Sequence, residues 1–61
     1  MSERLIALRN RSGLTEGCIA DRLFITIDNY RRYETGERKP TMEILARLVN
    51  VLGVGIDELL K

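Results

Sequence analysis

The stretch LTEGCIADRLFITIDNYRRYE, residues 14–34, contains two short helical patterns with a brief interruption between them. In its first half, Thr15 can cap a helix, and Glu16 follows in the first turn, where the helix dipole favours a negative charge. The apolar residues that share one face at helical spacing are Ile19, Ala20 and Leu23. This half of the stretch therefore predicts a helix over residues 15–23.

The second half of the stretch repeats the same signals. Thr26 is the next candidate N-cap, Asp28 follows in the first turn, and Tyr30 and Tyr33 share a face. A second helix is predicted over residues 26–34. Two short helices joined by a short turn define a helix-turn-helix.

The rest of the chain adds three helical segments around this motif. They are predicted over residues 2–12, about 41–52, and within VGIDELLK, residues 54–61. ETGERKP, residues 34–40, is expected to be a loop because it holds a glycine and a proline. The last helix is predicted to bury Ile56, Leu59 and Leu60. Because no segment alternates like a strand, the prediction is a compact all-α bundle of five short helices, with residues 1–61 as a single domain.

Composition argues against an enzyme, a metal site and a membrane span. The chain has no His, and Cys18 is its one cysteine, so neither a zinc site nor a His-based catalytic arrangement is expected. No cofactor is expected either. A lone cysteine without an apolar leader indicates the reducing cytoplasm, and no apolar run approaches the roughly 18 residues of a membrane helix.

Charge alone gives little support for nucleic-acid binding. The net charge is +1, with residues 1–40 carrying eight Lys and Arg against six Asp and Glu. Residues 41–61 carry two basic residues against three acidic ones. This asymmetry is too small to indicate a DNA-binding surface by itself.

Two longer motifs are more specific. GLTEGCIADRL, residues 13–23, resembles the GL(S/T)QxELAxxL segment of the Cro and phage-repressor family, also called Xre-like regulators. YETGERKPTMEILARLVNVLGVGIDELL, residues 33–60, resembles the loop and trailing helices of the same family. The resemblance covers almost the whole chain. It implies a lambda-repressor-like fold and a transcriptional regulator, more often a repressor, that binds a palindromic operator as a dimer.

Three residues depart from the family pattern. Glu16 stands where the family usually has Gln, and a carboxylate there would repel phosphate. Phe24 stands where the turn usually has Gly for a positive φ, which Phe adopts only with strain. Either the turn differs locally, or Phe24 fills part of the core or a partner surface. Gly55 replaces the usual Ser or Thr cap of the last helix, and it is a tolerable cap.

The resemblance implies that the helix over 26–34 enters the major groove, with both tyrosines turned inward. The candidates for base contact are Ile27, Asp28, Asn29 and Arg32. The positions that align with phosphate contacts are Thr15, Glu16, Thr26, Arg31, Arg38 and Lys39. Each has a plainer alternative, namely helix capping, apolar packing or a solvated surface charge. The resemblance also suggests an internal ion pair of Arg9 with Glu34, which would orient Arg9 towards the DNA backbone.

A dimer would have to use the helical body, since the chain carries no added oligomerisation segment. The candidate contact residues near its C-terminal end are Val51, Val54, Ile56 and Leu60. Two other interpretations stay open. In one, the helix-turn-helix fold serves protein interaction instead, as Glu16, Asp28 and Phe24 suggest. In the other, the chain is the DNA-binding part of a longer repressor or antitoxin.

Overall fold

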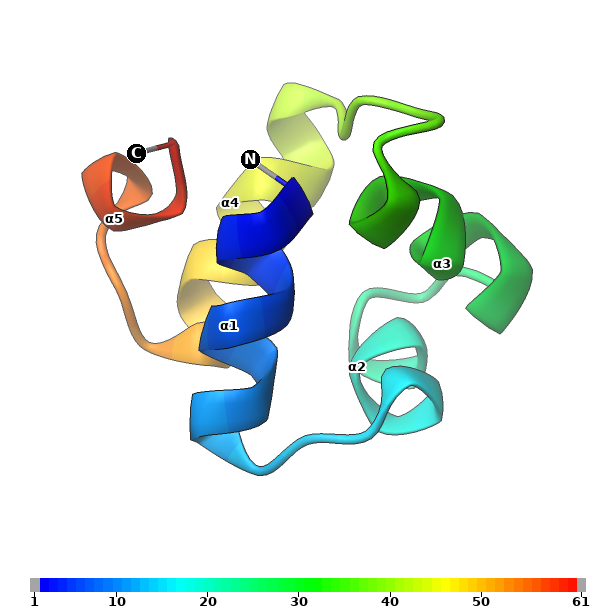
Figure 1. Cartoon of the computed structure of the whole chain (residues 1–61), viewed down its shortest axis with the longest axis horizontal. Coiled ribbons are helices and arrows are strands. Elements are labelled where there is room, and N and C mark those ends of the chain that lie inside the picture. Colours follow the sequence, from blue (N-terminus) through cyan, green and yellow to red (C-terminus); the bar gives the residue numbers. More distant parts are fainter. Residues whose placement is uncertain (1, 61) are drawn as a thin grey trace.

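The computed structural model describes residues 2–60, and Lys61 of the predicted last helix lies outside them. The helices are α1 (Ser2–Ser12), α2 (Glu16–Arg22), α3 (Ile27–Thr35), α4 (Met42–Leu52) and α5 (Ile56–Leu60) (Figure 1). Within residues 2–60 there is no strand. The predicted all-α architecture of five helices is confirmed, and the predicted helix limits are close to those observed.

The helix ends follow the predicted local chemistry. Three helices begin directly after a threonine whose side-chain oxygen accepts a hydrogen bond from the amide three residues on. The N···O distance is 3.1 Å for Thr15 and 3.2 Å for Thr26 and Thr41. Helices α3 and α4 are followed by the C-cap residues Gly36 and Gly53, which adopt the left-handed conformation with φ of 82° and 68°.

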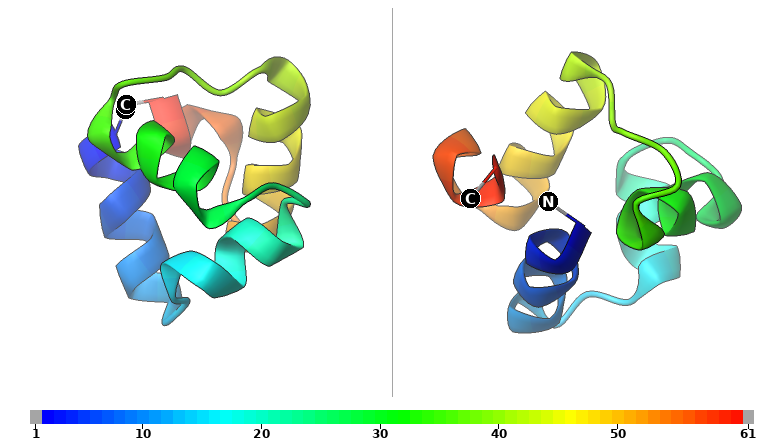
Figure 2. Two further views of the ribbon diagram at one scale, coloured as in Figure 1. Left: turned by 90° about the vertical axis from the view of Figure 1, so that its right-hand side faces the viewer. Right: turned by 45° about the horizontal axis from the view of Figure 1, so that its top comes forward.

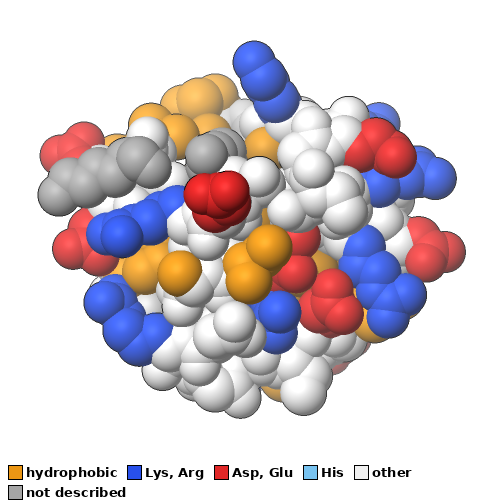
Figure 3. All heavy atoms as spheres, viewed as in Figure 1, with side chains coloured by type: hydrophobic (Ala, Val, Ile, Leu, Met, Phe, Trp, Pro, Cys, Tyr) orange, Lys and Arg blue, Asp and Glu red, His pale blue; other side chains and the backbone are white. Residues whose placement is uncertain are grey.

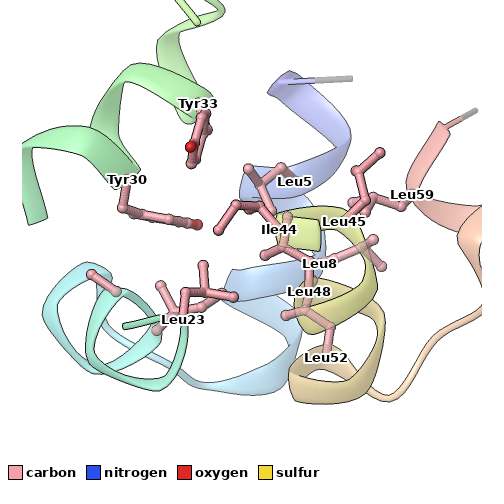
Figure 4. Packing of buried hydrophobic residues seen from close by; sticks show 12 residues of the cluster. Leu5, Leu8, Leu23, Tyr30, Tyr33, Ile44, Leu45, Leu48, Leu52 and Leu59 are labelled. Carbon is pink, nitrogen blue, oxygen red and sulfur yellow. The ribbon is translucent and has the colours of Figure 1, made fainter. Parts of the chain in front are cut away.

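The helices surround one core. In Figure 1, α2 and α3 lie together on one side, α5 lies on the other, and α1 and α4 stand between them. Views from two further directions show α3 lying across α2, with the long loop after α3 leading to the start of α4 (Figure 2). The apolar side chains converge in the space between the helices (Figure 4). The buried apolar residues are Leu5, Leu8, Ile19, Ala20, Leu23, Tyr30, Tyr33, Ile44, Leu45, Leu48, Leu52 and Leu59.

The prediction for the last helix was partly wrong. Leu59 is fully buried, but the side chains of Ile56 and Leu60 are 39% and 54% exposed. A helix of five residues makes little more than one turn. Only the side chain at the centre of its inner face reaches the core, and the two flanking side chains stay at the edge.

The turn between α2 and α3 keeps the backbone geometry that glycine usually provides. Phe24 has a φ of 60°, and it occupies the left-handed position of a Schellman motif. The amide of Phe24 donates to Asp21 O and that of Ile25 to Ala20 O, both at 3.1 Å. The Phe24 side chain is 83% exposed, so it does not fill the core. Its ring lies 5.5 Å from the Arg47 guanidinium carbon, a cation–π contact.

Candidate nucleic-acid interface

Helix α3 has one face fixed in the protein and one face open to solvent. Tyr30 is fully buried, and Tyr33 and Glu34 are each 8% exposed. The opposite side of α3 carries the predicted recognition residues. Of these, Ile27, Asp28, Arg31 and Arg32 are exposed, and Asn29 is half-buried. The sequence spacing therefore placed the inner and outer faces of this helix correctly.

A buried polar network holds α3 against α1. Arg9 Nε lies 2.5 Å from Glu34 Oε2, and the Tyr30 hydroxyl donates a hydrogen bond to the same carboxylate oxygen. Arg9 Nη1 also donates to Leu14 O at 2.9 Å. The hydrogen bond to Glu34 raises the pKa of Arg9, and burial is the largest cause that raises the pKa of Tyr30. The network links α1, the segment before α2 and the end of α3.

Arg9 itself is turned into the protein. Its side chain is 14% exposed, and two of its three guanidinium nitrogens contact Glu34 and Leu14. The structure thus brings the two predicted partners together. Arg9 therefore contacts the inner face of α3 through Glu34 and is not a free surface charge.

The exposed arginines of α3 have acidic neighbours. Arg31 Nε lies 3.5 Å from Glu16 Oε1, and Arg32 Nε lies 3.1 Å from Glu37 Oε2. Sequence reasoning treated Glu16 as a carboxylate that would repel phosphate, and it found neither pair. Glu37 reaches Arg32 because Gly36 turns the chain back over the end of α3, where the Arg38 amide donates to Arg32 O at 3.2 Å.

The remaining predicted contact residues surround this face. Thr15 and Thr26 cap α2 and α3, so each hydroxyl oxygen accepts from a backbone amide and its O–H stays available to donate. Arg38 Nη1 donates to Asn29 Oδ1 at 3.5 Å, and Lys39 is exposed in the loop. Basic and acidic side chains alternate over the side of the molecule where α3 lies, rather than forming one basic patch (Figure 3).

The sequence of the chain matches a known family. A family model described as a helix-turn-helix domain matches residues 1–60. The chain belongs to the helix-turn-helix domain family. The family predicted from the sequence is therefore confirmed, and α2 and α3 are the two helices of the motif.

Several relatives of this helix-turn-helix chain carry regulator names. It is 39% identical over 59 residues to the cryptic phage CTXphi transcriptional repressor RstR of Vibrio cholerae serotype O1, covering 97% of this chain and 53% of the repressor. It is 42% identical over 59 residues to the SPbeta prophage-derived uncharacterized HTH-type transcriptional regulator YonR of Bacillus subtilis (strain 168), covering 97% and 55%. It is also 42% identical over 60 residues to the uncharacterized HTH-type transcriptional regulator YqaE of the same organism, covering 98% and 52%. The chain spans about half the length of these relatives.

Other parts of the helix-turn-helix chain bear on the remaining predictions. Of the predicted dimer residues, Val51 and Val54 are half-buried, whereas Ile56 and Leu60 are exposed. No helix in residues 2–60 combines the length and apolar character needed to cross a membrane. The same residues contain no cluster of three or more His, Cys, Asp or Glu that could hold a metal ion.

Proposed function

We propose that this helix-turn-helix chain is a DNA-binding transcriptional regulator, acting as a repressor, with α3 as the helix that enters the major groove. The observation that carries the proposal is the division of α3 into two faces. Its inner face is locked by Tyr30, Tyr33 and Glu34, and its outer face presents polar side chains to solvent. A recognition helix needs this arrangement, because base edges are read by side chains whose helix cannot shift.

The outer residues of α3 have the chemistry for base reading. Arg32 is assigned to guanine, whose O6 and N7 accept two hydrogen bonds from a guanidinium. Asn29 is assigned to adenine, Asp28 to the amino group of cytosine, and Ile27 to the methyl group of thymine. Asn29 Oδ1 accepts from Arg38 Nη1 at 3.5 Å, and its second lone pair stays available for adenine.

The phosphate contacts are assigned to the residues that border this face. Arg31, Arg38 and Lys39 provide positive charge. At the N-termini of α2 and α3, which follow Thr15 and Thr26, backbone amides point outwards and can donate to phosphate. Glu16 and Glu37 oppose these cations. The balance of charge supports weak binding by one copy, with a shallow dependence on salt.

A homodimer on an inverted repeat would raise this affinity. Its half-sites would lie about 34 Å apart, one helical turn of DNA. The exposed side chains of Ile56 and Leu60, together with Val51 and Val54, are the proposed contact between copies. Sedimentation at high micromolar concentration tests this contact. A monomeric profile there would contradict the dimer.

A second function is favoured by one observation, the 83% exposure of Phe24. If the fold serves protein interaction, Phe24 and the 37% exposed Ile27 would form part of the contact, and no salt-sensitive DNA affinity would be found. Because the relatives are about twice as long, the proposed role includes that of the DNA-binding part of a longer cytoplasmic regulator.

Selection of bound duplexes from a random DNA library, at low and then at physiological salt, tests the function. We expect enrichment of an inverted repeat, and loss of preference at one base pair when Arg32→Ala is used. Absence of enrichment at both salt concentrations, with a folded protein, would overturn DNA regulation and favour a protein partner at Phe24.

A further inference from the structure

The exposed arginines of α3 are each paired, and each partner comes from outside α3. Glu16 is the first residue of α2, and Glu37 lies in the loop after α3. In both pairs the carboxylate oxygen lies near Nε, at 3.5 Å for Arg31 and 3.1 Å for Arg32. Arginine has five N–H donors, and four of them belong to the terminal nitrogens. Within residues 2–60, neither guanidinium makes a contact with hydrogen-bond geometry, so both contacts are ion pairs and the donors of each arginine stay available.

The position of Glu37 is set by the backbone as well as by charge. Gly36 reverses the chain with a φ of 82°. The Glu37 amide then donates to Thr35 Oγ1 at 3.3 Å, and Thr35 Oγ1 donates to Arg32 O at 3.1 Å. The loop is therefore folded against the last turn of α3. This holds the Glu37 carboxylate beside the stem of Arg32.

Exposed pairs of this kind add little to stability in water. The side chains of Arg32 and Glu37 are 52% and 67% exposed, and solvent screens their attraction. DNA placed over this face would exclude water and strengthen the attraction within each pair. The same carboxylates would repel phosphate, which lowers affinity for every sequence.

We propose that Glu37 is a positioning residue, whose carboxylate keeps the Arg32 guanidinium over the outer face of α3, where its donors can reach a base edge. This inference rests on the proposed function. Glu37 lowers the affinity for DNA of any sequence and raises the preference for the correct sequence. Specificity is a difference of affinities, so a group that weakens both complexes can still improve the ratio.

The test separates positioning from simple repulsion. Affinities for the selected duplex and for a scrambled duplex are measured at one salt concentration for Glu37→Gln and Glu37→Asp. Glu43→Gln is the matched control, because Glu43 is also exposed and lies 2.7 Å from an arginine, Arg47 of the same helix. Circular dichroism checks that each variant is folded.

We expect Glu37→Gln to bind the scrambled duplex more tightly while its preference for the selected duplex falls about five- to tenfold, the lower part of the range for one lost base contact. Glu37→Asp keeps the charge but shortens the reach, so its preference should fall without a gain in scrambled binding. The relaxed base pair should be the one relaxed by Arg32→Ala, and Glu43→Gln should change neither affinity.

Two results would overturn the inference while leaving the proposed function intact. Equal tightening of both duplexes by Glu37→Gln would mean that the acid only repels phosphate. Unchanged affinities in both Glu37 variants would mean that the pair has no role. If the wild-type chain binds neither duplex, the proposed function and this inference both fail.

Discussion

At the scale of single residues, Phe24 has a backbone conformation that is unfavourable for a residue with a side chain. Its φ of 60° lies in the left-handed region, where a Cβ atom crowds the following carbonyl. The Schellman hydrogen bonds of the turn and the Arg47 contact hold it there. Arg47 Nη1 also donates to Leu23 O at 2.9 Å, so this one side chain ties α4 to the turn.

Substitution of Phe24 separates the backbone strain from the side-chain contact. Phe24→Gly and Phe24→Ala both remove the ring, but only glycine relieves the left-handed strain. We expect the glycine variant to be more stable than the alanine variant by about 1–2 kcal/mol. Urea unfolding of the two variants measures this difference. Equal stability would show that the turn is not strained.

Tyr30 gives a prediction that depends on pH. Its hydroxyl donates to the carboxylate of Glu34, and loss of such a bond costs about 1.5–3 kcal/mol, so Tyr30→Phe should be destabilised near neutral pH. Because burial raises the pKa of Tyr30, the unfolded chain loses this proton first, at about pH 10. The stabilisation is therefore complete below pH 10 and falls by about 1.4 kcal/mol per pH unit above it.

Guanidinium unfolding of wild type and Tyr30→Phe at pH 7, 9 and 11 checks this behaviour. The stability gap between the two proteins should be constant from pH 7 to pH 9 and then narrow by pH 11. A gap that stays constant to pH 11 would contradict a buried, protonated Tyr30.

At the scale of helices, the caps set where α3 begins. Thr26 Oγ1 accepts from the Asn29 amide, which would otherwise lack a partner in the first turn of α3. Thr26→Ala should lower the free energy of unfolding by about 1 kcal/mol, and Thr26→Ser should keep most of it. Thermal unfolding of the three proteins gives the comparison, and equal losses for Ala and Ser would exclude the capping role.

The helices were predictable because their signals are local. Thr15, Thr26 and Thr41 each precede an apolar pattern, and Gly36 and Gly53 follow one. The partners of Arg31 and Arg32 were not predictable, because they depend on how α2 and the loop after α3 pack in space. The exposure of Ile56 was missed for a similar reason. Spacing gives the face of a helix, whereas burial depends on how much of that face a neighbour covers.

At the scale of the whole molecule, Glu34 is the residue through which α1 and α3 are joined. Its removal by Glu34→Ala would leave Arg9 and Tyr30 buried without their shared acceptor. We expect a loss of about 3–5 kcal/mol. A domain of this size has about 5 kcal/mol or less in total, so most of the variant should be unfolded at 25 °C.

Circular dichroism with urea titration tests this expectation, with Glu43→Ala as the control. The Glu43 side chain is 73% exposed and pairs with Arg47, and its loss should cost less than about 1 kcal/mol. A cooperative Glu34→Ala transition near that of wild type would show that the buried pair does not hold the two helices together.

The most direct test of the central claim is an NMR titration of the ¹⁵N-labelled chain with a duplex about two helical turns long, at low salt. If the outer face of α3 binds DNA, the amide shifts should concentrate on residues 27–32, on the start of α2 and on the loop around Lys39. Shifts centred on Phe24 and α4, or an absence of shifts, would contradict the assignment of α3 as the DNA-binding helix.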